Sequence, residues 1–182
     1  GMAGKVDGVI LSDFTSAHYF YDMAKPYLEA GTPIFINRPF AYSMQKAQMI
    51  TDLSKKTGTP IMCGDSHEYV KETNIVRQKV KEMEPLMGVQ ATNSMSDYAS
   101  HGIHGIYWLH AYLGGGVQSV SYITPDWRTP NGVCVLEYAP RVTDGKTFYA
   151  SLHQNVPTAT NASIKLYTKA SRYFQLDFMW EK

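Results

Sequence analysis

Residues 6–40 read VDGVILSDFTSAHYFYDMAKPYLEAGTPIFINRPF, and this stretch decides the fold of the first part of the chain. It opens with an apolar run, residues 6–11, that does not alternate with polar residues, as expected of a strand buried on both faces. A helical pattern follows and ends at Gly31, and residues 33–36 form a second buried run. The stretch therefore predicts a strand–helix–strand unit with a right-handed crossover.

The same alternation continues to residue 63. Ser43 is suited to cap a helix that ends at Gly58, and residues 60–63 form a third apolar run. Strands that alternate with helices in this way are typical of a parallel sheet, in which ligands bind beyond the C-terminal strand ends. Turn formation is the alternative explanation for any single polar residue at that edge. The polar residues that follow the three runs are Ser12, Asp13, Asn37, Arg38, Asp65, Ser66 and His67.

The pattern changes from Thr73 onward. A helix is predicted up to Pro85, and several later runs alternate apolar and polar residues, which favours an antiparallel sheet with one covered face. The sequence therefore predicts two domains, residues 1–66 and residues 67–182, the second of the α+β class. The expected strands of the second domain are 89–95, 117–123, 132–138, 148–153, 164–167 and 173–178.

Residues 96–116, SDYASHGIHGIYWLHAYLGGG, predict a helix that starts near two histidines and ends at three glycines. Three interpretations of His101 and His104 stay open at this point. They are helix capping, a metal site completed by Asp97, and acid–base chemistry, for which imidazole has a suitable pKa. The spacing of the histidines does not choose between them.

Composition excludes several classes of protein. The sequence has 17 basic and 16 acidic residues, and this balance argues against a nucleic-acid-binding protein. No apolar run is long enough to predict a membrane span. The two cysteines, Cys63 and Cys134, have no CxxC partner, so we expect reduced thiols and a cytoplasmic location.

The chain resembles the Gfo/Idh/MocA family of NAD(P)-dependent oxidoreductases over roughly residues 5–180. Within 6–40, the family has similar residues at His18, at the Glu29–Gly31 turn and at Pro39, where its motif is Glu-Lys-Pro. A second similarity is a histidine, His104, followed ten residues later by the glycine of a Leu-Gly helix end. Gly102 matches a glycine two residues before that histidine.

This resemblance implies an α/β fold followed by an α+β fold. Residues 1–66 would form the C-terminal half of a Rossmann-like parallel sheet, and residues 67–182 an open, mostly antiparallel sheet with helices on one face. The implied activity is hydride exchange between NAD or NADP and a CH–OH group of a small sugar or cyclitol, in a homo-oligomer that needs no metal. The implied catalytic residues are His104, Arg38 and His101, the cofactor-binding residues are Ser12, Asp13, His18, Asn37, Arg38 and Pro39, and the substrate-binding residues are His67, Asp97, Ser100 and Tyr107.

The chain differs from the family at several of these positions. The glycine-rich G-x-G-x-x-G turn is not in the sequence and is expected before Met2. Arg38 replaces the motif lysine, and because arginine stays protonated it orients an oxygen rather than transferring a proton. Ser100 stands where the family often has an aspartate. The alternatives are therefore a non-catalytic carbohydrate-binding or assembly protein and, less favoured, a metal-dependent hydrolase that uses Asp97, His101 and His104.

Overall fold

The computed structural model describes residues 1–83, 85–94, 102–124, 132–140, 145–156, 161–168 and 173–179. The chain divides into two compact units, Gly1–Asp65 and Ser66–Lys182. The first unit contains β1 (Val9–Leu11), η1 (Phe14–Tyr19), α1 (Phe20–Glu29), β2 (Ile34–Ile36), α2 (Met44–Thr57) and β3 (Ile61–Cys63). The second contains η2 (Ser66–Glu68), α3 (Lys71–Glu82), β4 (Leu86–Ser94), α4 (Ile103–Leu113), β5 (Val117–Ile123), β6 (Gly132–Tyr138), β7 (Phe148–Val156), β8 (Asn161–Thr168) and β9 (Tyr173–Met179).

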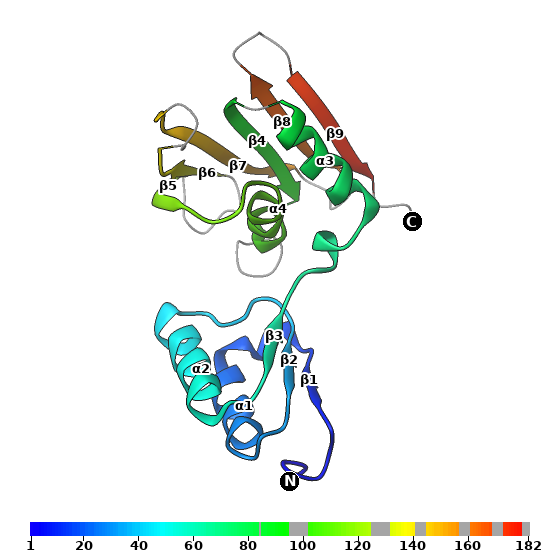
Figure 1. Ribbon diagram of the computed structural model, residues 1–182, viewed down its shortest axis with the longest axis vertical. Helices are drawn as coiled ribbons and strands as arrows, with labels where there is room; N and C mark the ends of the chain where they lie inside the picture. Colours follow the sequence, from blue (N-terminus) through cyan, green and yellow to red (C-terminus); the bar gives the residue numbers. More distant parts are fainter. Residues whose placement is uncertain are drawn as a thin grey trace. The chain divides into compact units, whose positions relative to one another are not determined.

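The first unit is a three-stranded parallel sheet in the order β1-β2-β3, as the sequence predicts. Helices α1 and α2 pack on one face of this sheet (Figure 1). The buried core joins Leu11 and Ile36 of the sheet to Phe20 and Leu28 of α1 and to Ile50 of α2. Because strands and helices alternate along the chain, the C-terminal strand ends meet at one edge.

The expectation that these strands are buried on both faces is wrong within this unit. Ile10, Phe35 and Met62 are aligned across the sheet and point away from the helices, and Ile10 and Met62 are 68% and 51% exposed. Successive residues of a strand face opposite sides, and the described helices of the unit cover only one of them. A run of apolar residues therefore did not distinguish a half-covered strand from a fully covered one.

The helix boundaries of the first unit follow local capping signals. Ser43 accepts a hydrogen bond from the backbone N–H of Lys46 (3.2 Å), and Gly58 ends α2 in the left-handed conformation, as predicted. The expected first helix is instead divided into the 3₁₀ turn η1 and the helix α1. Helix α1 continues through Pro26, whose missing N–H removes one helical hydrogen bond.

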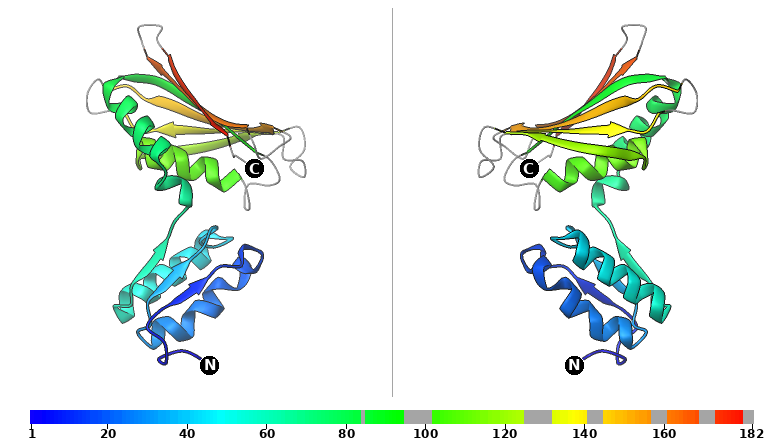
Figure 2. Two further views of the ribbon diagram at one scale, coloured as in Figure 1. Left: turned by 90° about the vertical axis from the view of Figure 1, so that its right-hand side faces the viewer. Right: turned by 90° about the vertical axis from the view of Figure 1, so that its left-hand side faces the viewer.

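The second unit is an open six-stranded sheet in the order β5-β6-β7-β4-β8-β9. All its neighbouring strands pair antiparallel except β4 and β7, so the predicted mostly antiparallel sheet is confirmed. Helices α3 and α4 lie on the same face of the sheet (Figure 2). Trp108 and Leu109 of α4, Val76 of α3 and Leu152 of β7 belong to the core between these layers.

No helix in the described part of the chain is long and apolar enough to cross a membrane. Cys63 lies in β3 and Cys134 in β6, and both are thiols rather than halves of a disulfide. Burial raises the pKa of the Cys134 thiol, so this side chain stays protonated and behaves as a small apolar group.

Candidate active site

Helix α4 holds His104 in its first turn. The side of the helix that is buried carries Gly105, Trp108, Leu109 and Tyr112, at the spacing of one helical face. His104 and Tyr107 lie off this face, three residues apart, and both are half-buried. Trp108 is 1% exposed and lies at the centre of the buried face.

Contacts at its two ends fix the direction of α4 across the sheet. Gly105 packs directly on the side chain of Leu152, the middle residue of β7. At the other end, Tyr112 and Leu113 share a cavity wall with Leu86 and Phe148, the first residues of β4 and β7. Helix α4 therefore runs opposite to these two parallel strands, and His104 lies toward their C-terminal ends.

Two buried amide side chains lie at the same C-terminal strand ends. Asn93 of β4 and Gln154 of β7 are paired in register, and they are 5% and 0% exposed. Each follows a buried residue two positions earlier, Ala91 or Leu152, so both face the helix side of the sheet. The amide nitrogen and oxygen of Gln154 have no hydrogen-bond partner among the residues that the structure describes. Such a group is costly to bury unless a ligand or water completes its hydrogen bonds.

The sequence analysis missed Asn93 and Gln154. A signal was present, because each amide occupies an inward position in an alternating strand whose other inward residues are apolar. To recognise this signal, one has to know which residues of 86–94 and 148–156 face the helices. In β4 the β-bulge changes which residues of the alternating pattern face inward.

The structure brings Ser12, Asn37 and Arg38 together at the C-terminal edge of the small sheet. The Asn37 side chain donates to the Ser12 carbonyl (3.0 Å) and accepts from the Arg38 backbone N–H (2.9 Å). The Asn37 backbone N–H also donates to the Leu11 carbonyl (2.8 Å). These bonds tie two strand ends to each other, and the peptide bond that follows, Arg38–Pro39, is cis.

Asp13 and His18 have structural contacts at this edge. The Asp13 carboxylate accepts hydrogen bonds from the hydroxyl and backbone N–H of Thr15 and from the Ser16 hydroxyl. These bonds, the Thr15 hydroxyl first, lower the pKa of Asp13. The His18 ring stacks on the Tyr42 ring, with 4.1 Å between centroids and an interplanar angle of 8°. Asp13 thus acts as the N-cap of η1.

The structure does not describe the side chains of four other predicted site residues. Asp97, Ser100 and His101 lie outside the described residues, and of His67 the structure describes only the backbone, in η2. Turn η2 packs against α4. Among the described residues no group of three or more His, Cys, Asp or Glu side chains could hold a metal ion, and the site of Asp97, His101 and His104 is untested. Arg38 belongs to the first unit and His104 to the second, so the expectation that both are catalytic residues of one site stays a prediction.

Comparison with known proteins places this architecture among dehydrogenase folds. No family model and no curated protein matches the sequence. An oxidoreductase from Sinorhizobium meliloti has a similar structure, with a TM-score of 0.73 and 11% identity, over 96% of this chain and 54% of that one. Apo scyllo-inositol dehydrogenase from Lactobacillus casei gives a TM-score of 0.70 and 10% identity, over 93% and 55% of the two chains.

A third similar structure is GenD2 of gentamicin A biosynthesis in complex with NAD. Its TM-score is 0.75 at 14% identity, over 94% of this chain and 54% of that one. The chain has the fold of these oxidoreductases over about half of their length. At such low identity the likeness establishes the fold, and the residues of the site have to support a function by themselves.

Proposed function

We propose that this chain carries the substrate-binding part of an NAD(P)-dependent oxidoreductase that acts on a CH–OH group of a sugar or cyclitol. The observation that carries the proposal is the position of His104, in the first turn of α4 and toward the strand ends that bear Asn93 and Gln154. Two of the similar structures, an inositol dehydrogenase and a complex with NAD, support the same class of reaction.

The site residues have chemically distinct roles in this proposal. Each amide side chain both donates and accepts, so Asn93 and Gln154 suit a ligand whose neighbouring hydroxyls do the same. A polyol would complete the hydrogen bonds that the Gln154 amide lacks. His104 would accept the proton of the hydroxyl that is oxidised, and Tyr107, one turn later, would contact the same ligand.

The edge of the first unit fits the nicotinamide end of a dinucleotide better than its pyrophosphate. Asn37 and Arg38 are held in place by hydrogen bonds, and Arg38 supplies a permanent positive charge that would orient a substrate oxygen. The Asp13 carboxylate is committed to capping η1. When bound, the nicotinamide would supply the hydride acceptor. The nicotinamide would be contacted by Ser12, Asn37, Arg38 and Pro39. His18 is near Ser12 in the sequence.

Titration with NADH and NADPH tests the proposal. We expect saturable binding of one of the two nucleotides and polyol-dependent reduction of its oxidised form. His104→Asn should lower turnover by about 10²–10⁴-fold, the range for removal of a general base, while leaving nucleotide affinity unchanged. His110→Asn is the matched control, because His110 is exposed near the other end of the same helix. Equal loss in both variants would refute the role of His104.

A non-catalytic carbohydrate-binding protein is the second candidate. The incomplete hydrogen bonding of Gln154 supports it equally well, because a sugar could bind there without any redox chemistry. Calorimetric titration with inositols in the absence of nucleotide separates the two candidates. Sugar binding that is insensitive to NADH and NADPH, with no nucleotide binding, would favour this alternative. A stoichiometric metal that survives dialysis would instead favour the hydrolase.

A further inference from the structure

A cavity lies in the second unit at the far end of α4 from His104. Its volume is about 410 Å³, within the range of small-molecule sites. The walls are apolar and include Val80, Leu86, Leu113 and Phe148. Leu113 lies nine positions after His104 in the helix, about 14 Å along the axis, so this cavity is distinct from the candidate active site.

Two cationic side chains of α3 line this cavity. Arg77 and Lys81 are four residues apart and share one face of the helix. The Nε–H of Arg77 donates to the carbonyl of Ala111 (2.9 Å), in the last turn of α4, which holds the guanidinium against the cavity. One edge of the guanidinium is engaged in this way, and its remaining N–H groups are the kind that bind a carboxylate in pairs.

The nearby acidic groups leave this positive charge largely unneutralised. Glu82 of the same helix pairs with Lys79 at 2.6 Å and accepts from Gln78 at 2.8 Å. Among the described residues, no ion pair joins Arg77 or Lys81 to a carboxylate. Glu72, at the start of α3, is close enough to act electrostatically on Tyr112, where it opposes Arg77.

The buried hydroxyl of Tyr112 adds a polar group to the apolar wall. Tyr112 is 5% exposed, and no described residue has good hydrogen-bond geometry to its hydroxyl, although Thr73 is near enough to favour the ionised form. Burial raises the pKa of Tyr112 to about 12, so the hydroxyl stays protonated at neutral pH and can donate. Phe148, which also lines the cavity, stacks on Tyr138 with 4.7 Å between ring centroids.

We propose that this cavity binds a small amphipathic carboxylate. The alkyl or aryl part of the ligand lies on Val80, Leu86, Leu113 and Phe148, and its carboxylate is bound by Arg77 and Lys81. The planar guanidinium matches the two oxygens of a carboxylate, and the apolar walls disfavour a heavily hydroxylated ligand such as a sugar. The site therefore takes a different class of ligand from the candidate active site.

Calorimetric titration of the whole chain with sodium octanoate tests this inference. We expect saturable binding that weakens at high salt, and weaker binding of octanol, which lacks the charge. The double variant Arg77→Gln, Lys81→Gln should lose about tenfold or more in affinity, since it removes charge-assisted hydrogen bonds. Lys79→Gln is the matched control, because Lys79 pairs with Glu82 and is not part of the cavity wall.

A second variant tests the apolar wall without changing the charges. Leu113→Trp is expected to fill the cavity and to abolish octanoate binding, while circular dichroism reports an intact fold. The inference is overturned if octanoate does not bind or binds no better than octanol. It is also overturned if the double variant binds octanoate as well as Lys79→Gln does. Tighter binding of octyl phosphate than of octanoate would overturn the carboxylate assignment.

Discussion

The Asp13 carboxylate accepts three hydrogen bonds at the start of η1. This residue, at the C-terminal edge of the small sheet, therefore acts as a helix cap. Its oxygens accept from the Thr15 hydroxyl at 2.6 Å, the Thr15 N–H at 3.0 Å and the Ser16 hydroxyl at 2.7 Å. The ionised form makes these bonds best, which is why the pKa of Asp13 is lowered.

Asp13→Ala is expected to lower the urea midpoint of the chain at neutral pH. Because the folded pKa lies below the unfolded one, the contribution of Asp13 is present above the unfolded pKa and is lost as the pH falls through the folded value. The difference in urea midpoint between wild type and variant should therefore shrink as the pH falls below the ordinary pKa of aspartate. Asp7→Asn, at an exposed position, is the control. A pH-independent difference would contradict this explanation.

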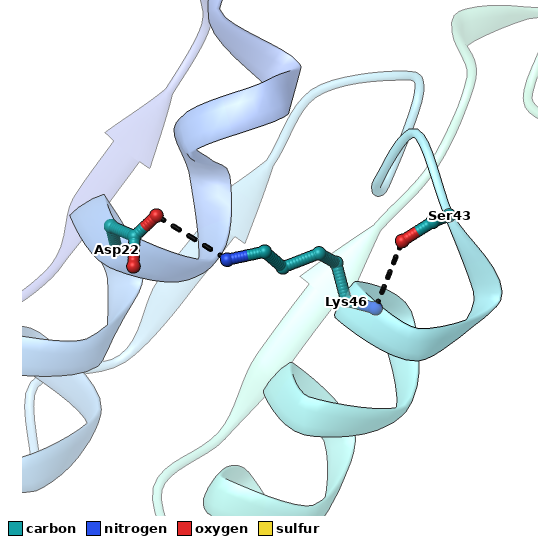
Figure 3. A network of polar contacts seen from close by, with 3 residues as sticks. All are labelled: Asp22, Ser43 and Lys46. Atoms are coloured by element: carbon teal, nitrogen blue, oxygen red, sulfur yellow. Dashed lines mark hydrogen bonds and ion pairs between the residues drawn. The ribbon is translucent and has the colours of Figure 1, made fainter.

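At the scale of the element, two kinds of interaction can be compared at the start of α2. One is a side chain that caps the backbone, and the other is an ion pair on the surface. Ser43 accepts from the Lys46 N–H, while the Lys46 ammonium reaches Asp22 of α1 at 3.4 Å (Figure 3). The side chains of Lys46 and Asp22 are 37% and 62% exposed, so solvent weakens their attraction.

Ser43→Ala should therefore destabilise the chain by about 1 kcal/mol, the usual cost of losing an N-cap. Lys46→Gln keeps the capped N–H but removes the ion pair, and should cost less than about 0.5 kcal/mol. Denaturant unfolding of both variants measures the two free energies. If Lys46→Gln lowered the free energy of unfolding more than Ser43→Ala does, the ion pair and not the cap would be the stronger of the two interactions.

Helix α4 depends on close contact between Gly105 and the sheet. A methyl group at residue 105 would collide with the fully buried Leu152 side chain. Gly105→Ala should destabilise the chain by about 1–2 kcal/mol, because overpacking outweighs the gain in helix propensity. Gly115→Ala is the control, since open space surrounds residue 115. Adding Leu152→Val should restore part of the lost stability in a double-mutant cycle.

At the scale of the whole molecule, apolar side chains are exposed on the sheet face opposite α3 and α4. Met87 and Tyr149 are 50% and 52% exposed there, and Tyr167 donates to Gln90 at 3.1 Å. Exposed apolar patches of this kind are typical of protein interfaces. Self-association of the chain through this face is therefore our proposal for its oligomeric state.

Sedimentation velocity is expected to give a mass above that of the 182-residue monomer. The double variant Tyr149→Glu, Tyr167→Glu should shift the chain toward the monomer, because it adds two like charges to the proposed interface. Tyr69→Glu, at a position that is 66% exposed outside this face, should leave the mass unchanged. A monomeric wild type would exclude the proposal.

Local chemistry made much of this fold predictable. Neighbouring residues determine the Ser43 and Gly58 caps, the strand at 132–138 and the alternation of the later strands. These features could therefore be predicted from the sequence alone. His104 could be assigned to the start of a helix for the same reason.

Local patterns along the chain were enough to predict most of the strands and helices, and the helix that bears His104. The folded structure was needed to show that β4 lies between β7 and β8, that Asn93 and Gln154 are paired in register, and that Ile10 and Met62 are uncovered. The physical reason is that helix caps and strand alternation arise from residues a few positions apart. Strand order and burial depend on surfaces contributed by residues far apart in the chain.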